Sequence, residues 1–147
     1  MVLFFLRVAL VCVNKIIIPP ATTKHPQSAK HVEEAQAAKY PRIVTVDRPS
    51  TLARRTLVNT FPAMKTCRAD NKKINTGDPK TDYDCDEYPQ AVFRENAGKP
   101  SVKSIRANDN RGSGNKIGYY LKAHANENQV EVVVPVLKGK LYCKDAF

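Results

Sequence analysis

The sequence contains no tryptophan, and aromatic residues make up only 7% of its 147 residues. A surface that stacks the bases of single-stranded nucleic acid needs a row of aromatic side chains, so this scarcity argues against one. Cys-x-x-Cys pairs and Cys/His clusters at zinc spacing are also absent from the sequence, which argues against a structural zinc site. The apolar run at residues 1–13, interrupted by Arg7, is too short to span a membrane as a helix.

Acidic residues are scarce relative to basic ones. The chain has 14 Asp and Glu against 24 Lys and Arg, which gives a formal net charge of +10. An excess of this size favours a polyanionic partner, either a nucleic acid or an anionic surface, although a soluble cationic protein would have the same composition. A chain of 147 residues can build one hydrophobic core but not two, so a single domain is expected.

The apolar N-terminus is interpreted as a signal peptide, residues 1–13, followed by a mature domain over residues 14–147. Its first residues carry no positive charge and no clean Ala-x-Ala cleavage site follows, so a membrane-tethered or artefactual N-terminus is the alternative. We therefore expect a secreted protein that is free of the membrane and monomeric in its mature form. Cys12 would be removed with the signal peptide.

Hydrophobic periodicity predicts an α+β fold, with a small mixed sheet and flanking helices. Strands are expected at residues 15–18, 42–47, 89–95, 101–107 and, in the sheet interior, 129–136; helices are expected from Pro26 to before Pro41, after Ser50 or Thr51, and over residues 111–125. Residues 96–100 are typical of a hairpin turn. His25 and His31 are six residues apart, which is not the spacing of metal ligands on a helix, so both are expected on the surface.

The segment from Cys67 to Asp84 is rich in Lys, Asp, Asn and Gly and has no apolar period, which predicts a loop. A disulfide between Cys67 and Cys85 would close this loop and, in the chain-entropy model, would stabilise the fold by roughly 3 kcal/mol. Cys143 could replace either partner in that disulfide.

An acidic cluster at residues 81–93 is unusual in this basic chain. Carboxylates mostly lie on the surface without a specific task, so a solvated acidic loop is one interpretation of it. A second polar segment, Asn108-Asp109-Asn110-Arg111-Gly112-Ser113-Gly114-Asn115, leads into a helical pattern. An acid before a hairpin, together with an asparagine where the next helix begins, is the outline of a ββα-metal nuclease site.

These two segments resemble the signatures of the secreted deoxyribonucleases of the NucA/NucB type, an Asp-Glu-aromatic-Pro motif and a downstream Asn-Arg-Gly-x-Gly. In this chain they are Asp86-Glu87-Tyr88-Pro89 and Asn110-Arg111-Gly112-Ser113-Gly114. The resemblance also includes Pro26 to Ala35, Val46-Asp47-Arg48 and Ala53-Arg54-Arg55, so it extends over residues 15–136. It implies an α+β domain that hydrolyses DNA at a hairpin-helix active site of the ββα-metal kind.

The resemblance identifies Asp86 as the general base that activates water, in the place where many ββα-metal enzymes use histidine. Glu87 is a second catalytic candidate, with ordering of the loop or pairing with Arg54 or Arg55 as alternatives. Asn110 offers a neutral oxygen to a hard divalent cation, Mg²⁺ or Mn²⁺. A neutral ligand suits this position because the substrate phosphate itself brings negative charge.

Three arginines are candidates for phosphate contacts. Arg111 follows the metal-ligand candidate, and Arg54 and Arg55 are neighbours on a helix, about 100° apart, so only one of them can point at a given site. A solvated cationic face is the alternative interpretation of that pair. Tyr88 is expected to pack rather than to react, and Gln90 could hold water bound to the cation.

The sequence therefore predicts a secreted, metal-dependent endonuclease that hydrolyses the phosphodiester bonds of DNA. Little sequence preference is expected, because a cationic groove contacts phosphates, which carry no sequence information. Two alternatives remain open: a cationic nucleic-acid-binding or antimicrobial protein on an inactive nuclease scaffold, and a ribonuclease toxin that acts on RNA.

Overall fold

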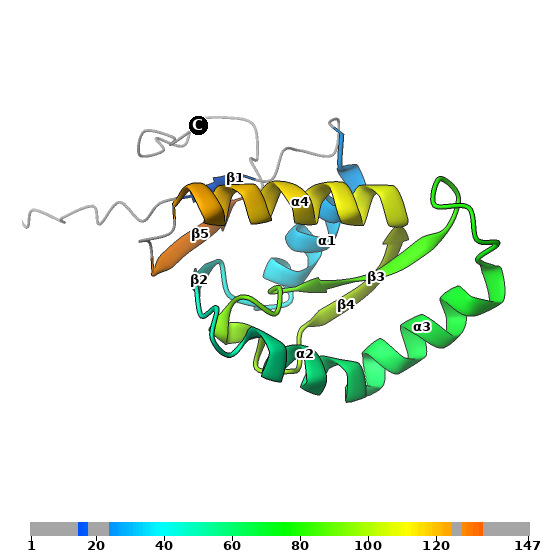
Figure 1. The fold of residues 1–147 in the computed structure, drawn as a ribbon, viewed down its shortest axis with the longest axis horizontal. Helices are drawn as coiled ribbons and strands as arrows, with labels where there is room; N and C mark the ends of the chain where they lie inside the picture. Colours follow the sequence, from blue (N-terminus) through cyan, green and yellow to red (C-terminus); the bar gives the residue numbers. More distant parts are fainter. Residues whose placement is uncertain (1–14, 18–23, 125–127, 134–147) are drawn as a thin grey trace, which may run out of the picture.

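The computed structural model describes residues 15–17, 24–124 and 128–133 of the chain (Figure 1). Its elements are β1 (Lys15–Ile17), α1 (Pro26–Ala37), β2 (Ile43–Thr45), α2 (Thr51–Thr60), α3 (Pro62–Ile74), β3 (Tyr83–Tyr88), a 3₁₀ turn (Arg94–Asn96), β4 (Ser101–Arg106), α4 (Ala107–Ala123) and β5 (Gln129–Val133). The predicted α+β class is confirmed, with four helices and two small sheets in these ranges. The proposed signal peptide, Cys12 and Cys143 lie outside the described residues.

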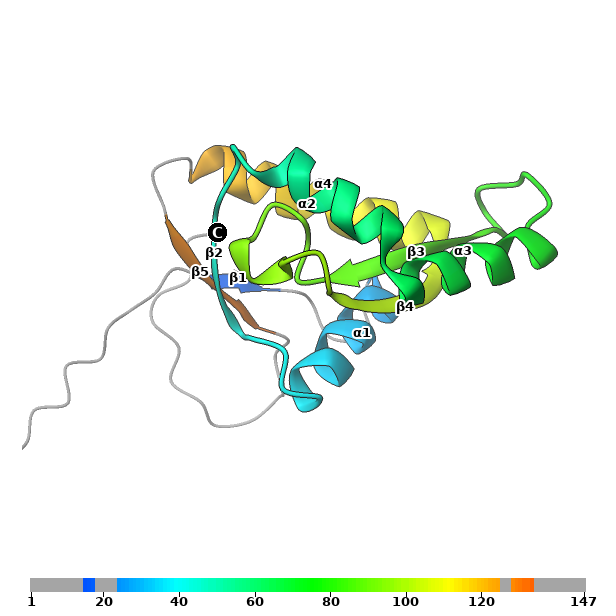
Figure 2. The same ribbon diagram turned by 90° about the horizontal axis from the view of Figure 1, so that it is seen from below.

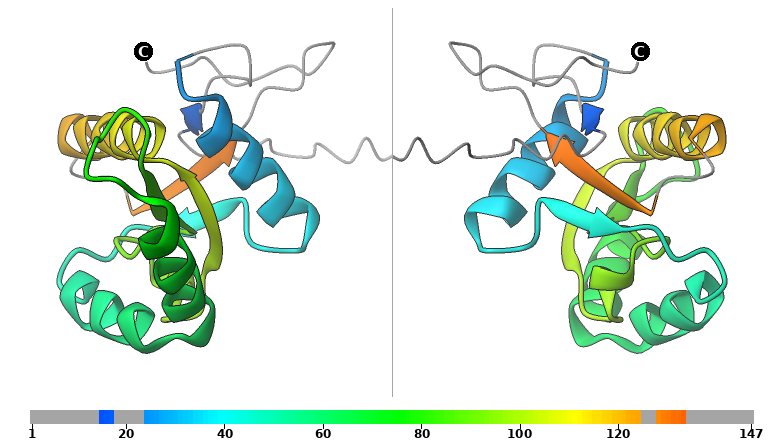
Figure 3. Two further views of the ribbon diagram at one scale, coloured as in Figure 1. Left: turned by 90° about the vertical axis from the view of Figure 1, so that its right-hand side faces the viewer. Right: turned by 90° about the vertical axis from the view of Figure 1, so that its left-hand side faces the viewer.

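The strands form a three-stranded mixed sheet and a two-stranded hairpin. In the mixed sheet β5 is central, parallel to β1 and antiparallel to β2, which confirms the interior position predicted from its β-branched run. β3 and β4 form the antiparallel hairpin. Figure 3 shows α1 and α4 on one side of this hairpin and the consecutive helices α2 and α3 on the other.

The core lies where the mixed sheet, α1, α4 and the hairpin meet. Tyr88 and Phe93 are fully buried there, packed with Ala29, Val32, Ala35, Val44, Ile117, Leu121, Val130 and Val132. Tyr88 packs as predicted: its hydroxyl donates a hydrogen bond to the Pro41 carbonyl oxygen at 2.7 Å, and burial raises its pKa to about 12. The acidic motif therefore lies on a strand whose last residue, Tyr88, is anchored in the core.

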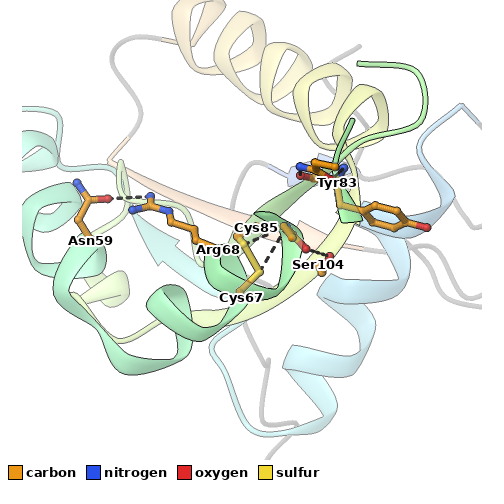
Figure 4. Close-up of a disulfide and its surroundings, with 8 residues drawn as sticks. Asn59, Cys67, Arg68, Tyr83, Cys85 and Ser104 are labelled. Carbon is orange, nitrogen blue, oxygen red and sulfur yellow. Dashed lines mark hydrogen bonds between the residues drawn. A yellow bond between two sulfur atoms is a disulfide. The ribbon is translucent and has the colours of Figure 1, made fainter. Parts of the chain in front are cut away.

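The prediction of a loop over residues 67–84 is wrong for residues 67–74, which belong to α3. This helix runs alongside the hairpin (Figure 2). This helix has no apolar stripe because only two of its residues are buried. Polar and covalent contacts hold it instead: Asn71 accepts a hydrogen bond from the Ser104 hydroxyl at 2.6 Å, and Cys67 forms the predicted disulfide with Cys85 (Figure 4). A period search for apolar residues cannot detect a helix attached in this way.

The hairpin begins earlier in the chain than predicted. The acidic motif itself is strand β3, whereas residues 89–95, predicted as a strand, form turns and the start of the 3₁₀ segment. Their apolar side chains are buried from a loop rather than from a pleated strand, and Phe93 is fully enclosed. β4 agrees with the predicted strand at 101–107, except that Ala107 already belongs to α4.

Helix α4 begins at Ala107, four residues before the predicted start at residue 111. Its buried Asp109 accepts hydrogen bonds from the backbone N–H groups of Gln27 and Ser28, at 2.9 and 3.1 Å. These N–H groups belong to the first turn of α1 and have no partner within their own helix, so Asp109 caps α1 from another element. The cap fixes α1 against α4.

Candidate active site

A groove of about 700 Å³ runs along the open edge of the hairpin, between α4 and the α2–α3 pair. The polar and glycine residues that line it include Thr51, Arg55, Asn59, Arg68, Asp86, Glu87, Gln90, Asn110, Arg111, Ser113, Gly114, Asn115 and Gly118. The structure thus brings together all the residues predicted for catalysis, metal binding and phosphate contacts, with the exception of Arg54.

Strand β3 places two adjacent carboxylates at this groove. Alternation along the strand directs them to opposite faces of the hairpin, as expected: Asp86 faces α1, and Glu87 shares the face of Cys85, which is bonded to α3. The outer edge of β3 has no strand partner among the described residues, so both side chains border the same groove. They are close in space despite their opposite directions.

The Asp86 carboxylate is oriented by a buried histidine of α1. His31 Nδ1 lies 2.7 Å from Asp86 Oδ2, and His31 Nε2 lies 3.0 Å from Ser101 Oγ. An ionised carboxylate only accepts hydrogen bonds, so Nδ1 is the donor in this pair. Asp86 is 8% exposed and His31 only 1%. The prediction that His31 lies on the surface was wrong.

The sequence did contain a signal for His31. The buried face of α1 includes Ser28 and Ala35, and His31 follows the first by three residues and precedes the second by four. This is the spacing of side chains on one face of a helix. The distance from His25 along the chain says nothing about which face of α1 is buried, so it gave no indication that His31 is enclosed.

Burial raises the pKa of Glu87 above its ordinary value, and the neighbouring Asp86 raises it further. A backbone hydrogen bond and the charges of Arg55 and Arg68 act in the opposite direction. The Glu87 Oε1 atom accepts that hydrogen bond from the Ala91 N–H group at 2.9 Å. Glu87 therefore orders the loop after β3, which is one of the roles expected for it, while it borders the groove.

Two amide oxygens at the groove fit a hard cation. Asn110 lies in the first turns of α4, and its side chain makes no hydrogen bond with the described part of the chain. Gln90 Oε1 is buried and has no hydrogen-bond partner within those ranges either. No group of three or more His, Cys, Asp or Glu among the described residues is placed to hold a metal. A cation here would therefore be held by few protein oxygens together with water and substrate, and Mg²⁺ usually keeps several of its waters when a protein binds it.

The structure corrects the prediction for Arg54. This residue is 7% exposed, and its guanidinium donates to Asp47 Oδ2 at 2.9 Å and to the Ala91 carbonyl oxygen at 2.6 Å. It holds the loop after β3 in place, so its donors are not directed at a phosphate. Arg55 is exposed and lines the groove, as expected if only one of the two neighbours faces a site. A phosphate contact stays a prediction for Arg55.

Arg111 lies at the rim of the groove, where it binds Asp84. Its Nε and Nη2 atoms donate to the two carboxylate oxygens at 2.9 and 3.1 Å, and 59% of its side chain is exposed. An exposed ion pair of this kind contributes little to stability, so an incoming phosphate can compete with Asp84 for the guanidinium. Its phosphate contact also stays a prediction.

Glycines of α4 shape one wall of the groove. A Cβ at Gly112 would lie 2.2 Å from His25 Cε1, so the close approach predicted there is real. A Cβ at Gly114 or Gly118 would meet no atom within 4 Å, so these two glycines are not required by packing. They are one helical turn apart and line the groove, which is wider because neither has a side chain.

Comparison with known proteins indicates a distant similarity to a nuclease. No family model matches the chain. The chain is similar to the DNA-entry nuclease of Bacillus subtilis (strain 168), with 27% identity over 107 residues, which cover 73% of this chain and 63% of that protein. The chain therefore spans less than two thirds of this relative, and the similarity supports a distant relationship to a nuclease. Helices long and apolar enough to cross a membrane are not found among the described residues.

Proposed function

We propose that this chain is a divalent-cation-dependent endonuclease that hydrolyses phosphodiester bonds of DNA with little sequence preference. The observation that carries the proposal is the environment of Asp86, a buried carboxylate held by His31 at the wall of a groove that also contains Asn110. The similarity to a DNA-entry nuclease supports DNA as the substrate. The net charge of +10 supports a polyanionic partner.

The proposed reaction is the attack of water on phosphorus. Asp86 accepts a proton from the water, the water oxygen bonds to phosphorus, and the bond to the leaving ester oxygen breaks. Arg55 and Arg111 bind the non-bridging oxygens, where negative charge increases. Asn110 and Gln90 would hold Mg²⁺ or Mn²⁺ together with water, and the bound cation would neutralise charge on the phosphate and on the leaving oxygen.

We also propose that the protein acts outside the cytosol. The Cys67–Cys85 disulfide supports this localisation, because structural disulfides persist in oxidising compartments and are rare in cytosolic proteins. Cys85 lines the groove and immediately precedes Asp86 on β3, and its partner Cys67 precedes Arg68 of α3, which also lines the groove. An oxidising environment would thus keep one wall of the groove attached to the strand that carries the general base.

Digestion of supercoiled plasmid tests the proposed function. We expect the purified chain to nick and then linearise the plasmid with Mg²⁺ or Mn²⁺, and to be inactive in EDTA, because the amide and carboxylate oxygens of the groove need a cation to neutralise the phosphate. The measurement is the loss of supercoiled DNA on an agarose gel. If the protein shifts the mobility of the plasmid but cleaves it with none of the cations, the proposal is refuted, and a cationic nucleic-acid-binding protein is supported. Cleavage of RNA alone would support the ribonuclease alternative.

His31 is expected to act on the reaction by positioning Asp86. Replacement with leucine removes the hydrogen bond to Asp86 Oδ2, and we expect kcat to fall about 10- to 100-fold, the usual cost of losing a partner that orients a functional group. The KM for DNA should change little, because His31 is buried and does not contact the substrate. The measurement is steady-state cleavage of a labelled DNA duplex.

The asparagine variant separates positioning from packing. The amide nitrogen of His31→Asn lies near the position of Nδ1, so this variant should recover much of the kcat lost in His31→Leu. Ser101→Ala, which removes only the Nε2 contact, serves as the control and should have a much smaller effect. Equal losses of kcat in the Leu and Asn variants, at equal melting temperatures, would contradict the positioning role.

A further inference from the structure

A second cavity, of about 510 Å³, lies between α3 and β3. It shares three lining residues with the groove, Arg68, Cys85 and Asn110, so the two hollows adjoin. The proposed chemistry assigns no role to this second cavity.

The wall formed by α3 carries two cations, and the charge of one of them, Arg68, also acts on Glu87 in the adjoining groove. Arg68 and Lys72 are exposed and one helical turn apart, which separates their Cβ atoms by about 5–6 Å. Neither forms an ion pair within the described residues, and Arg68 instead bonds the neutral amide of Asn59 at 2.9 Å (Figure 4). The acid of this cavity, Asp84, is already paired with Arg111. The cavity therefore presents net positive charge.

The helix that carries these cations is joined covalently to the strand that carries Asp86. Cys67, which precedes Arg68, is bonded to Cys85, which precedes Asp86. Figure 4 shows the disulfide joining α3 to β3 beside the Arg68 side chain. The disulfide therefore limits the movement of the α3 backbone relative to the strand of Asp86.

We propose that the second cavity binds two successive backbone phosphates of the DNA strand, next to the phosphate that is cleaved, one through Arg68 and one through Lys72. Their spacing is comparable with that of successive phosphates along a strand. This inference rests on the proposed function, since the cleaved phosphate defines the direction of the strand. The contact reads no base, so it adds affinity and sets the path of the DNA without adding sequence preference.

Binding of a labelled DNA duplex in EDTA tests this site without cleavage. Each phosphate contact contributes about 0.9 to the slope of log affinity against log salt concentration. We expect Lys72→Ala to reduce this slope by about 0.9, and the Arg68→Ala/Lys72→Ala double variant to reduce it by about 1.8. The measurement is fluorescence anisotropy of the duplex, titrated with the full chain at several salt concentrations.

Lys73→Ala is the matched control. Lys73 is the next residue of the same helix and carries the same charge, but it pairs with Asp70 at 2.7 Å and lines neither cavity. Its removal should leave the slope unchanged. Equal slopes for Lys72→Ala and Lys73→Ala would overturn the inference. The protein could show the expected slopes and yet fail to cleave DNA with either Mg²⁺ or Mn²⁺. That result would refute the proposed function but would still support the phosphate-binding site.

Discussion

Replacing Asp86 with asparagine is expected to reduce DNA cleavage by about 10²- to 10⁴-fold, the range over which general acid–base catalysis contributes. Asparagine has nearly the same size as aspartate, and its side-chain oxygen can accept a hydrogen bond from His31 Nδ1. The buried hydrogen bond, 2.7 Å long in the wild type, can therefore still form. The amide cannot accept a proton from water. The loss should therefore appear in kcat for a labelled duplex, and binding of the duplex in EDTA should persist.

A second aspartate provides the control for charge. Asp70→Asn makes the same chemical change on α3, where the side chain is exposed, pairs with Lys73 and does not line the groove. This variant should cleave DNA at the wild-type rate and melt at the wild-type temperature. If Asp86→Asn cleaves as fast as Asp70→Asn, Asp86 is not the general base, and Glu87 becomes the next carboxylate to test.

The resemblance to a known nuclease family singled out two pairs of adjacent residues, and the structure places both pairs at one groove. Asp86 and Glu87 are adjacent, and Asn110 and Arg111 are adjacent, so each pair could be identified without knowledge of the fold. The hairpin and α4 then bring both pairs to one groove. The element types were also predictable where apolar residues are periodic, as in α1, or β-branched, as in β5, because burial of one face imposes that period.

Contacts between distant elements could not be predicted in the same way. His31 meets Asp86 across 55 positions of sequence, and Asp109 caps α1 across 82. Nothing in the residues around His31 indicates its partner. Helix α3 was missed for a related reason: a disulfide and polar contacts such as Asn71 to Ser104 attach it, so it needs no apolar period. Its cations at the second cavity were missed along with the helix.

Arg54 and Arg55 are neighbours in sequence, and their replacement by alanine should have opposite consequences. Arg54→Ala is expected to reduce the free energy of unfolding by roughly 2 kcal/mol, because it leaves the buried Ala91 carbonyl oxygen without its donor. It also removes the hydrogen bond to Asp47. Arg55→Ala should change that free energy by no more than about 0.5 kcal/mol, since the side chain is exposed. Urea unfolding at neutral pH measures both.

The part of this loss of stability that comes from the contact between Arg54 and Asp47 should depend on pH. The hydrogen bond from Arg54 lowers the pKa of Asp47 below its ordinary value of 3.8. A carboxyl group with a lowered folded-state pKa contributes its stabilisation fully above the unfolded-state value and loses it as the pH falls through the folded-state value. The difference in the free energy of unfolding between wild type and Arg54→Ala should therefore be constant near neutral pH and should decrease below pH 3.8. In DNA binding the order of the two variants reverses: Arg55→Ala should weaken affinity and lower its salt dependence, whereas folded Arg54→Ala should bind DNA as wild type does.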